Sequence, residues 1–472
     1  MSVFHYIFIA LEVVLLFNLL IGVHELGHFL AAKWRGLKVD RFAIWFGKPI
    51  WKTKINGVEY ALGWIPAGGY VALPQMAAMD AIEGKSETPV EQLPPVSALD
   101  KIIVAFAGPL FSFGLALFFA IIVWQVGRPD IEADDTTTVG WVDPNGPAGK
   151  AGLLPGDTIL EVDGHSVKHF APTGSDSVKW CIITSEGTNI PIKYIRNGQV
   201  AMAYPVPYHR PTKWYERKAL RQILMDSVQP AIVGDVVSNS PASLAGLTNG
   251  DEIIAMNGEK IYSPWTIDSA ENAMSNGPVV PLTFTVKRGD TNFDCTLTAT
   301  KPLLPTNGVP MLGIVSWMAD TNILLIHPNP FDQIKSSVGQ IFATIQAITA
   351  HKSEVGVQQL GGAVMIGRVY YSLLQDEEGW RRVLWFSVIL NVNLALLNLL
   401  PLPVLDGGHI VLSLLEVVRR RPVSARILNS IQTGFAMLII GFMLYIAFFD
   451  TGDWVRSAHA DHGQQIIFAP HK

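Results

Sequence analysis

Four long stretches of the chain are apolar at almost every position. They cover residues 3–23, 102–126, 383–400 and 427–449. Each approaches the ~20 apolar residues that a helix needs to cross a bilayer, so the pattern predicts a membrane protein with four transmembrane helices. The first stretch has no basic residue before it and no small-residue cleavage site after it. We therefore expect a retained span rather than a signal peptide.

The long segment between the second and third spans contains an internal repeat. Residues 147–164 align without gaps with residues 241–258, and nine of the eighteen positions are identical. A repeat of this kind indicates two copies of one domain rather than a solenoid of short units. Each copy reads as a short helix, a Gly-Asp turn and a β-rich run, which is similar to the PDZ domain. We expect two tandem α+β PDZ-like domains, at residues 128–221 and 222–306.

The role of these two domains stays open on the sequence alone. PDZ domains capture extended peptides by adding them to a sheet edge, while two spacer domains without a bound peptide fit the same pattern. Residues 307–382 are expected to supply a further edge of the second domain and an amphipathic helix on the membrane surface. That helix is predicted because apolar positions recur at helical spacing between about residues 329 and 362.

A separate β element is predicted between the first and second spans. Asn56-Gly57 stands between two β-prone runs, which is typical of a tight hairpin turn. Two arrangements fit this pattern, namely a hairpin that re-enters the membrane with an available edge and an ordinary cytoplasmic sheet. The membrane part would then comprise residues 1–127, with this element, and residues 383–472.

Composition narrows the class of protein and the kind of metal site. Only 16% of the 472 residues are charged, against roughly 25% in soluble domains. A formal net charge of -5 gives no reason to expect a nucleic-acid partner. The two cysteines, Cys181 and Cys295, cannot build a cysteine zinc site. Any metal must therefore be held by histidine and carboxylate.

The distribution of basic residues predicts the orientation in the membrane. Lys33, Arg35 and Lys38 follow the first span, and Arg419 lies between the third and fourth. Short loops rich in Lys and Arg stay in the cytoplasm. We therefore expect both termini and residues 127–382 on the extracytoplasmic side.

The sequence His24-Glu25-Leu26-Gly27-His28 comes directly after the first apolar stretch. On a helix, residues four apart share a face, so both imidazoles can reach one cation, while Glu25 is rotated by about 100° and can address a water on it. The alternative is a set of polar side chains that extend from a helix end to the interface. Ionisable groups at membrane depth are costly and are rarely left without a function, which favours a metal site.

A catalytic zinc needs a third protein ligand and one open position. Asp406 is the candidate, because two prolines stop the third span shortly before it and two glycines after it permit a tight turn. The predicted topology brings the ends of the first and third spans to the same depth. His409 is a competing ligand, and an interfacial histidine after a turn is the other interpretation of that residue.

These features together resemble the site-2 protease family, of the bacterial regulator-of-sigma-E type. The resemblance includes the His-Glu-x-x-His motif, the late motif from Asn398 to Gly407, the tandem PDZ-like insertion and the four spans, and it covers essentially the whole chain. It implies intramembrane proteolysis, with Zn²⁺ held by His24, His28 and Asp406 and with Glu25 as the general base. The substrate contacts that it implies fall on Asn393, Asn398, Gly68 and Gly69. The two asparagines also fit a simpler role as hydrogen-bond donors between helices.

The resemblance also implies partners and a location. The substrate would be a transmembrane helix of another protein, cut first by an upstream site-1 type protease, and the two PDZ-like domains would exclude substrates that are still intact. Membrane lipid would surround the protein in the bacterial inner membrane, with the active site near the cytoplasmic leaflet. The chain departs from the family pattern at Trp45, where many relatives have glycine, and at Ser112, where asparagine is usual.

Two other functions remain possible on the sequence. One is a membrane-anchored PDZ scaffold with a structural or vestigial zinc site, although Glu25 has no use in a structural site. The other is a zinc enzyme that acts on a lipid or on a soluble peptide at the interface.

Overall fold

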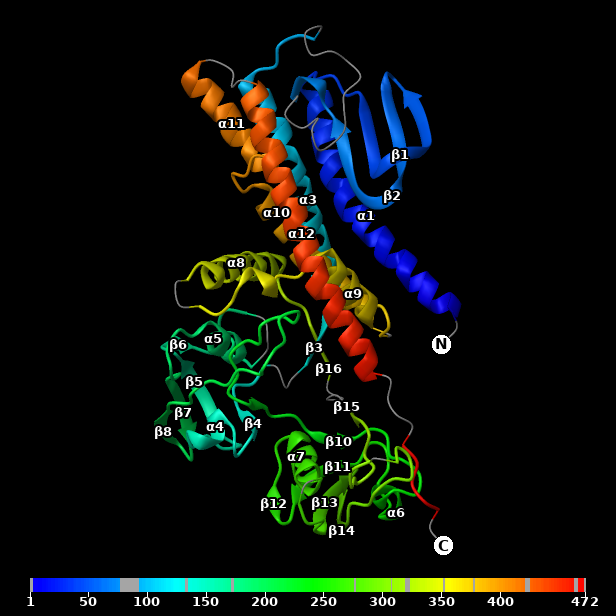
Figure 1. Cartoon of the computed structure of the whole chain (residues 1–472), viewed down its shortest axis with the longest axis vertical. Helices are drawn as coiled ribbons and strands as arrows, with labels where there is room; N and C mark the ends of the chain where they lie inside the picture. Colours follow the sequence, from blue (N-terminus) through cyan, green and yellow to red (C-terminus); the bar gives the residue numbers. More distant parts are fainter. Residues whose placement is uncertain are drawn as a thin grey trace. The chain divides into compact units, whose positions relative to one another are not determined.

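The computed structural model of the chain falls into two compact units, which are described separately (Figure 1). It describes residues 3–76, 93–131, 135–170, 174–275, 277–306, 308–318, 323–350, 353–376, 378–420, 425–461 and 466–470. The first unit comprises Met1–Pro129, Ile326–Ile341 and Leu360–Thr451, and the second Asp130–Leu325, Phe342–Gln359 and Gly452–Lys472.

Four helices in the described part of the chain are long and apolar enough to cross a membrane. They are α1 (Val3–Trp34), α3 (Ala98–Val126), α10 (Gly379–Asn398) and α12 (Ala425–Asp461). The number of spans is as the apolar pattern predicts. Within the first unit, α3 packs against α1, α10 and α11 (Asp406–Arg419).

The first helix is longer than its apolar stretch. α1 runs to Trp34, whereas the predicted span ended at residue 23, because no helix breaker occurs before Gly36, which ends the helix with φ 74°. The His-Glu-x-x-His sequence therefore lies inside the helix rather than at its edge. This correction matters because only a continuous helix keeps the two imidazoles on one face.

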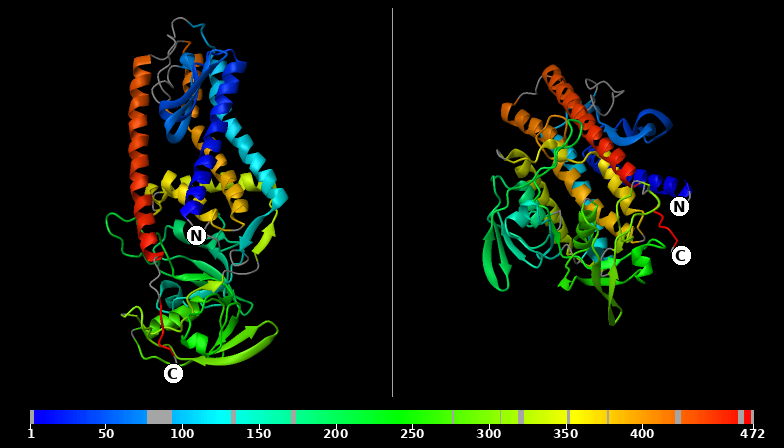
Figure 2. Two further views of the ribbon diagram at one scale, coloured as in Figure 1. Left: turned by 90° about the vertical axis from the view of Figure 1, so that its right-hand side faces the viewer. Right: turned by 60° about the horizontal axis from the view of Figure 1, so that its bottom comes forward.

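The predicted hairpin is present as β1 (Arg41–Ile55) and β2 (Val58–Ala72). Asn56 and Gly57 form its turn with φ values of 48° and 80°, as expected for a tight hairpin turn. The hairpin curls so far that residues 41–44 pair with both 59–62 and 69–72. It lies beside the C-terminal half of α1 (Figures 1 and 2). Its depth relative to a bilayer stays a prediction.

The second unit contains the two repeated domains, each with its own core. The first has the sheet β6-β5-β7-β8 and the pair β4–β9, with helices α4 and α5. The bounds are β4 (Val139–Val142), α4 (Pro147–Lys150), β5 (Thr158–Val162), β6 (His165–Ser166), α5 (Val178–Thr184), β7 (Ile192–Arg196), β8 (Gln199–Ala203) and β9 (Met225–Ser227). Since β9 pairs with β4 and Met225 lies in the first core, the first domain extends past residue 221, the boundary that the sequence predicts.

The second domain repeats this plan around the strand order β14-β13-β11-β10-β15, with β12 beside β11. The bounds are β10 (Ala231–Val233), α6 (Pro241–Leu244), β11 (Glu252–Met256), β12 (Glu259–Lys260), α7 (Trp265–Met274), β13 (Leu282–Arg288), β14 (Thr291–Leu297) and β15 (Trp317–Met318). The assignment of both domains as PDZ-like stays a prediction.

The connection from the second domain back to the spans contains two helices. α8 (Pro330–Thr349) lies in the region where the sequence predicts an amphipathic helix, and α9 (Ala363–Leu373) follows it. Two short strands, β3 (Arg128–Ile131) and β16 (Ile323–Ile326), pair with each other. The position of α8 on a membrane surface stays a prediction.

Candidate metal centre

The two imidazoles of the His-Glu-x-x-His sequence point at one place. His24 and His28 stand one turn apart on α1 and are 7% and 2% exposed. Their Nε2 atoms are 3.2 Å apart. A neutral imidazole has only one N–H to donate. If each ring uses that N–H at Nδ1, both Nε2 atoms present lone pairs, and two lone pairs this close suit a shared cation better than a hydrogen bond to each other.

Groups on α3 hold both rings from behind. His28 Nδ1 lies 2.8 Å from the backbone oxygen of Val104. That oxygen can only accept, so Nδ1 carries the hydrogen and Nε2 presents its lone pair. His24 Nδ1 lies 3.0 Å from the hydroxyl of Ser112, which is fully buried. Partners of this kind fix the tautomer and orientation of metal-bound histidines.

The places of Ser112 and Val104 behind the two rings are not evident from the sequence. Ser112 stands out there only as a departure from the family pattern. A signal for the whole region was available in Ala107-Gly108-Pro109, because a glycine in the middle of a span often marks a close approach of helices. A Cβ on Gly108 would overlap the His28 ring, so no larger residue fits there.

The third candidate ligand reaches the same place from a distant part of the chain. α10 ends at Asn398, before the two prolines, and Asp406 begins α11 after a tight turn. Asp406 Oδ2 lies 3.3 Å from His24 Nε2, and Oδ1 lies 3.4 Å from His28 Nε2. Within the described ranges, these three side chains are the group of histidines and acids whose ligand atoms all lie within 4.8 Å of one another. His409 is buried but does not belong to it.

The turn before Asp406 depends on glycine. A Cβ on Gly407 would overlap the backbone oxygen of Leu399, and a Cβ on Gly408 would overlap that of Leu402. The chain therefore folds back on the end of α10 only because these two positions carry no side chain. This close turn directs the Asp406 carboxylate to the two imidazoles.

Glu25 lies beside the cluster and has no structural partner for one of its oxygens. Its Oε2 is buried and makes no hydrogen bond. A cavity of about 170 Å³ adjoins it, lined by Ile21, His24, Glu25, His28, Leu394, Asn398, Val404, Leu405 and Asp406. This volume is ample for a few waters. A carboxylate in this position can take a proton from a water held next to the two imidazoles.

The four residues that the resemblance implied as substrate contacts are placed differently from one another. Asn398 lines the cavity, with its Nδ2 at 3.5 Å from His24 Nε2. Gly69 lies against the side chain of Glu25, because an added Cβ would stand 3.3 Å from Glu25 Cγ. Gly68 packs instead against the ring of Phe46, with φ 75°. Asn393 is outside the residues that line the cavity, and its Oδ1 is buried without a partner.

Trp45, the other departure from the family pattern, occupies a position with glycine-like backbone. Its φ is 69°, a region that bulky residues rarely adopt. Its indole N–H donates to the side-chain oxygen of Asn18 on α1. That bond ties β1 to the first span, which a glycine at this position cannot do.

The donor set fits a zinc ion. Two imidazole nitrogens and one carboxylate, with both rings oriented by partners behind them, match the ligands of catalytic zinc, which keeps one position open for water. Asp406 Oδ2 is buried and accepts no hydrogen bond from the described residues. A buried carboxylate normally has hydrogen-bond donors or a metal around it.

Comparisons with known proteins agree with this chemistry. The chain matches the model of Peptidase family M50 over residues 12–441. It is 29% identical to the regulator of sigma E protease of Haemophilus influenzae, over 91% of this chain and 96% of that protein. A putative zinc metalloprotease of Vibrio cholerae is 28% identical over 89% and 92%. The regulator of sigma-E protease RseP of Salmonella typhimurium is 25% identical over 90% and 94%.

Solved structures match as well, and one of them is similar to part of the chain. It is the PDZ domain of an SdrC-like protein from Listeria monocytogenes, 24% identical, which covers 18% of this chain and 83% of that one with a TM-score of 0.15. A score this low carries no argument about fold or function. The family model, by contrast, spans most of the sequence and includes the whole cluster. The chain therefore belongs to peptidase family M50 and is an intramembrane zinc metalloprotease.

Proposed function

We propose that His24, His28 and Asp406 hold the zinc ion and that Glu25 is the general base of peptide hydrolysis inside the membrane. The observation that carries this proposal is the convergence of three ligand atoms within 4.8 Å of one another. Both rings have partners on α3 that orient them. The buried Oε2 of Glu25, which makes no hydrogen bond, supports the role of this carboxylate as base.

In the proposed hydrolysis, the zinc ligands, Glu25 and Asn398 have different roles. Zinc bound by these ligands would lower the pKa of its water to about 7 and polarise the peptide carbonyl. Glu25 would take a proton from the attacking water as its oxygen adds to the carbonyl carbon. The same carboxyl group then gives the proton to the leaving nitrogen. Asn398, whose amide lines the cavity, is placed to hold the substrate backbone.

The substrate proposed here is a transmembrane helix that unwinds locally. A helix hides its carbonyls in its own hydrogen bonds, and freed backbone groups in lipid cost several kcal/mol each unless another group accepts them. A strand edge can do so. Residues 69–72 form one side of the curled sheet, and Gly69 lies against Glu25. An unwound substrate that adds to this edge would bring its backbone to the cavity.

The proposed substrate has already been shortened by another protease. Two of the relatives are named for regulation of sigma E, which suggests an inner-membrane substrate such as an anti-sigma factor. The two repeated domains would act as the size filter, on the extracytoplasmic side. Deletion of residues 139–300 should then let intact substrate be cut while pre-cut substrate is cut as before. If the deleted form cuts pre-cut substrate only, the filter is ruled out.

The alternative of a scaffold with a structural metal is disfavoured by Glu25. A structural site uses all four positions for ligands and needs no base. In this cluster Glu25 stands beside the three proposed ligands, and its buried Oε2 makes no hydrogen bond. Hydrolysis of a soluble peptide at the interface stays an outcome of the test below.

The direct test is cleavage of a model transmembrane peptide by the purified full chain in nanodiscs. Glu25→Gln should abolish cleavage at unchanged zinc content, and a chelator should do the same to the wild type. Glu12→Gln is the matched control, because Glu12 is on the same helix outside the residues that line the cavity. Unchanged cleavage by Glu25→Gln would remove the proposed base. Cleavage of a soluble peptide but not of the transmembrane peptide would favour the interfacial enzyme.

A further inference from the structure

A loop of the first repeated domain carries basic and aromatic residues that the protease chemistry does not use. It covers residues 209–221, with the sequence HRPTKWYERKALR, and is called here the 209–221 loop. It contains five basic residues and one acidic residue. Trp214 at its tip is 88% exposed, more than any other large hydrophobic side chain in the described ranges.

The tip of the loop is a well-defined turn. The backbone N–H of Glu216 donates to the oxygen of Lys213 at 2.9 Å, and the Glu216 carboxylate accepts from the N–H of Lys213 at 3.2 Å. Trp214 and Tyr215 occupy the two central positions, with ring centroids 5.5 Å apart. The exposed indole of Trp214 therefore lies on a hydrogen-bonded turn.

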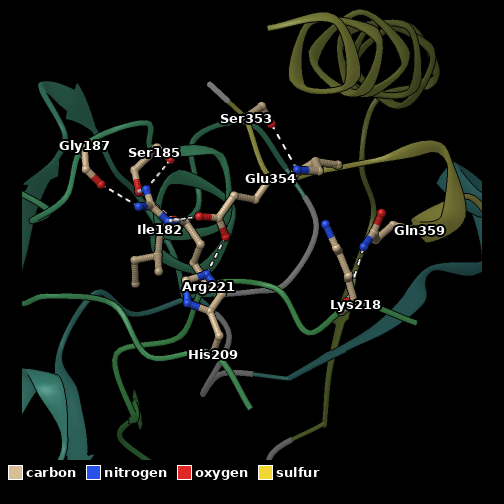
Figure 3. A network of polar contacts seen from close by, with 10 residues as sticks. Ile182, Ser185, Gly187, His209, Lys218, Arg221, Ser353, Glu354 and Gln359 are labelled. Carbon is tan, nitrogen blue, oxygen red and sulfur yellow. Dashed lines mark hydrogen bonds and ion pairs between the residues drawn. The ribbon is translucent and has the colours of Figure 1, made fainter. Parts of the chain in front are cut away.

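The base of the loop is fixed by a polar network (Figure 3). His209 at its start donates to Glu354, and Arg221 at its end lies 3.5 Å from the same carboxylate. Arg221 is 6% exposed, and its guanidinium also donates to the hydroxyl of Ser185 at 2.9 Å and to the oxygen of Gly187 at 2.5 Å. Both ends of the loop are thus held by one carboxylate from the connection between α8 and α9.

The middle of the loop is bonded to the end of a membrane span. Arg217 Nε lies 2.6 Å from Asp453 Oδ2, and Arg217 also donates to the backbone oxygen of Gln358. Asp453 is in the last turns of the candidate span Ser430–Ser457 of α12. The next residue, Trp454, is 54% exposed. Tryptophan at a span end lies at the level of the lipid headgroups.

We propose that the 209–221 loop is a membrane anchor, in which Trp214 lies in the headgroup layer and the exposed Arg210, Lys213 and Lys218 face anionic lipid. Three features support this occupant. The loop is fixed to the end of a span. Its three exposed basic residues carry the charge opposite to that of phosphatidylglycerol headgroups. Its exposed tip is a tryptophan followed by a tyrosine, the two residues enriched at membrane interfaces. The anchor requires α12 to span the membrane but does not depend on which residues catalyse proteolysis.

The anchor would fix the first repeated domain relative to the membrane. Its charges pair with headgroup phosphates, so its hold should weaken in zwitterionic lipid and at high salt. The same domain also carries exposed apolar residues on β8, which is the alternative contact surface for a protein partner. The test must therefore distinguish lipid from protein.

The test measures the depth of a fluorophore in the full chain in nanodiscs. A fluorophore is attached to Trp214→Cys, in a Cys295→Ser background, since Cys181 is buried in the core. Lipids with a nitroxide on the headgroup quench fluorophores at the interface. Trp454→Cys is the positive control at the span end, and Leu244→Cys, 53% exposed on α6, is the control for exposure alone. A second fluorophore site at Lys213→Cys leaves Trp214 in place.

The anchor predicts that both loop sites are quenched nearly as strongly as the site at 454, and at least about twice as strongly as the site at 244. Quenching should be stronger with phosphatidylglycerol than with phosphatidylcholine, by the charge argument above. Quenching of both loop sites at the level of residue 244 in either lipid would overturn the anchor and leave a protein partner for Trp214. Equal quenching in the two lipids would overturn the role of the basic residues.

Discussion

The two repeated domains and the membrane site each bury an aspartate, and the surroundings of these carboxylates differ. Asp157 and Asp251 are each 1% exposed, and Arg196 and Arg288 donate two hydrogen bonds to them, at 2.6 and 2.7 Å in both domains. A backbone amide adds a third donor at 2.8 Å in each. Asp406 is 5% exposed, faces two imidazoles at 3.3 and 3.4 Å, and leaves Oδ2 without a hydrogen bond.

This comparison separates carboxylates whose hydrogen bonds are supplied by the protein from one whose hydrogen bonds are not. Burying a charge is costly unless hydrogen bonds or an opposite charge offset the lost hydration. In the repeats, the arginine and the backbone amide beside each Gly-Asp turn meet that requirement with protein groups alone. In the membrane the protein groups do not meet it, and a cation between Asp406 and the imidazoles would.

The largest effect is expected from neutralising the membrane aspartate. Asp406→Asn should reduce cleavage of a transmembrane substrate by at least about 10²-fold, because a lost ligand should weaken metal binding beyond the 10 to 100-fold typical of groups behind the ligands. The melting temperature of the metal-free protein should stay within a few degrees of the wild type. Activity and melting of metal-free protein check this together. Retained activity would show that Asp406 is not needed at the centre.

The second effect is expected from the matching change in a repeat. Asp251→Asn leaves the carboxylate's partner Arg288 with a weaker acceptor and should cost about 2 kcal/mol, as for a hydrogen bond to a charged group. Hydrogen exchange of the second domain in the full chain measures this loss. Cleavage of a pre-cut substrate should be unchanged, and a loss of cleavage as large as that of Asp406→Asn would erase the distinction between the two kinds of carboxylate.

A smaller effect is expected from the hydroxyl behind His24. Ser112→Ala removes the partner of Nδ1 and should weaken zinc binding about 10 to 100-fold. Ser387→Ala is the control, because Ser387 is also buried in the membrane unit but bonds to Tyr370 instead. Competition with a chelator measures the affinity. Equal affinities for the two variants would mean that Ser112 does not orient the ring.

The smallest effect is expected from a half-buried acid of the second domain, Glu271 on α7. Burial raises the pKa of its carboxyl to about 7, which is the net result after a lowering by the hydrogen bond from the Leu312 amide and a small rise from the nearby Asp268. The folded state then holds its proton above pH 4.5, where the unfolded chain has lost it, so stability should fall as the pH rises from about 4.5 to 7. Glu271→Gln should flatten that dependence by a few degrees of melting temperature. An unchanged slope would contradict it.

Much of the membrane architecture could be predicted from the sequence. The four spans follow from apolar length, and Asn56-Gly57 sets the hairpin turn. The pairing of His24 with His28 follows from helical spacing alone. The position of Asp406 near the two imidazoles could be predicted, because prolines before it end the third span and glycines after it permit a tight turn.

Other features could not be predicted, for physical reasons. Ser112 and Val104 act through packing of α3 against α1, which no local pattern encodes. The apolar stretch ends at residue 23, but α1 continues to Trp34, because apolar content marks the span and does not mark the end of the helix. The boundary predicted at residue 221 lies too early, because β9 pairs with β4 and a contact between distant strands leaves no local signal in the sequence. The Arg217–Asp453 bond that positions the 209–221 loop is also a contact between distant segments.

The most direct test of the central claim is the zinc content of purified full-length protein, measured by mass spectrometry after dialysis against a weak chelator. Wild type, Glu25→Gln and Asp251→Asn should each retain about one zinc per chain, while His24→Ala, His28→Ala and Asp406→Asn should each retain almost none. The account would be contradicted if the single variants Asp406→Asn and His24→Ala both kept full zinc occupancy. Loss of zinc from Asp251→Asn would contradict it as well.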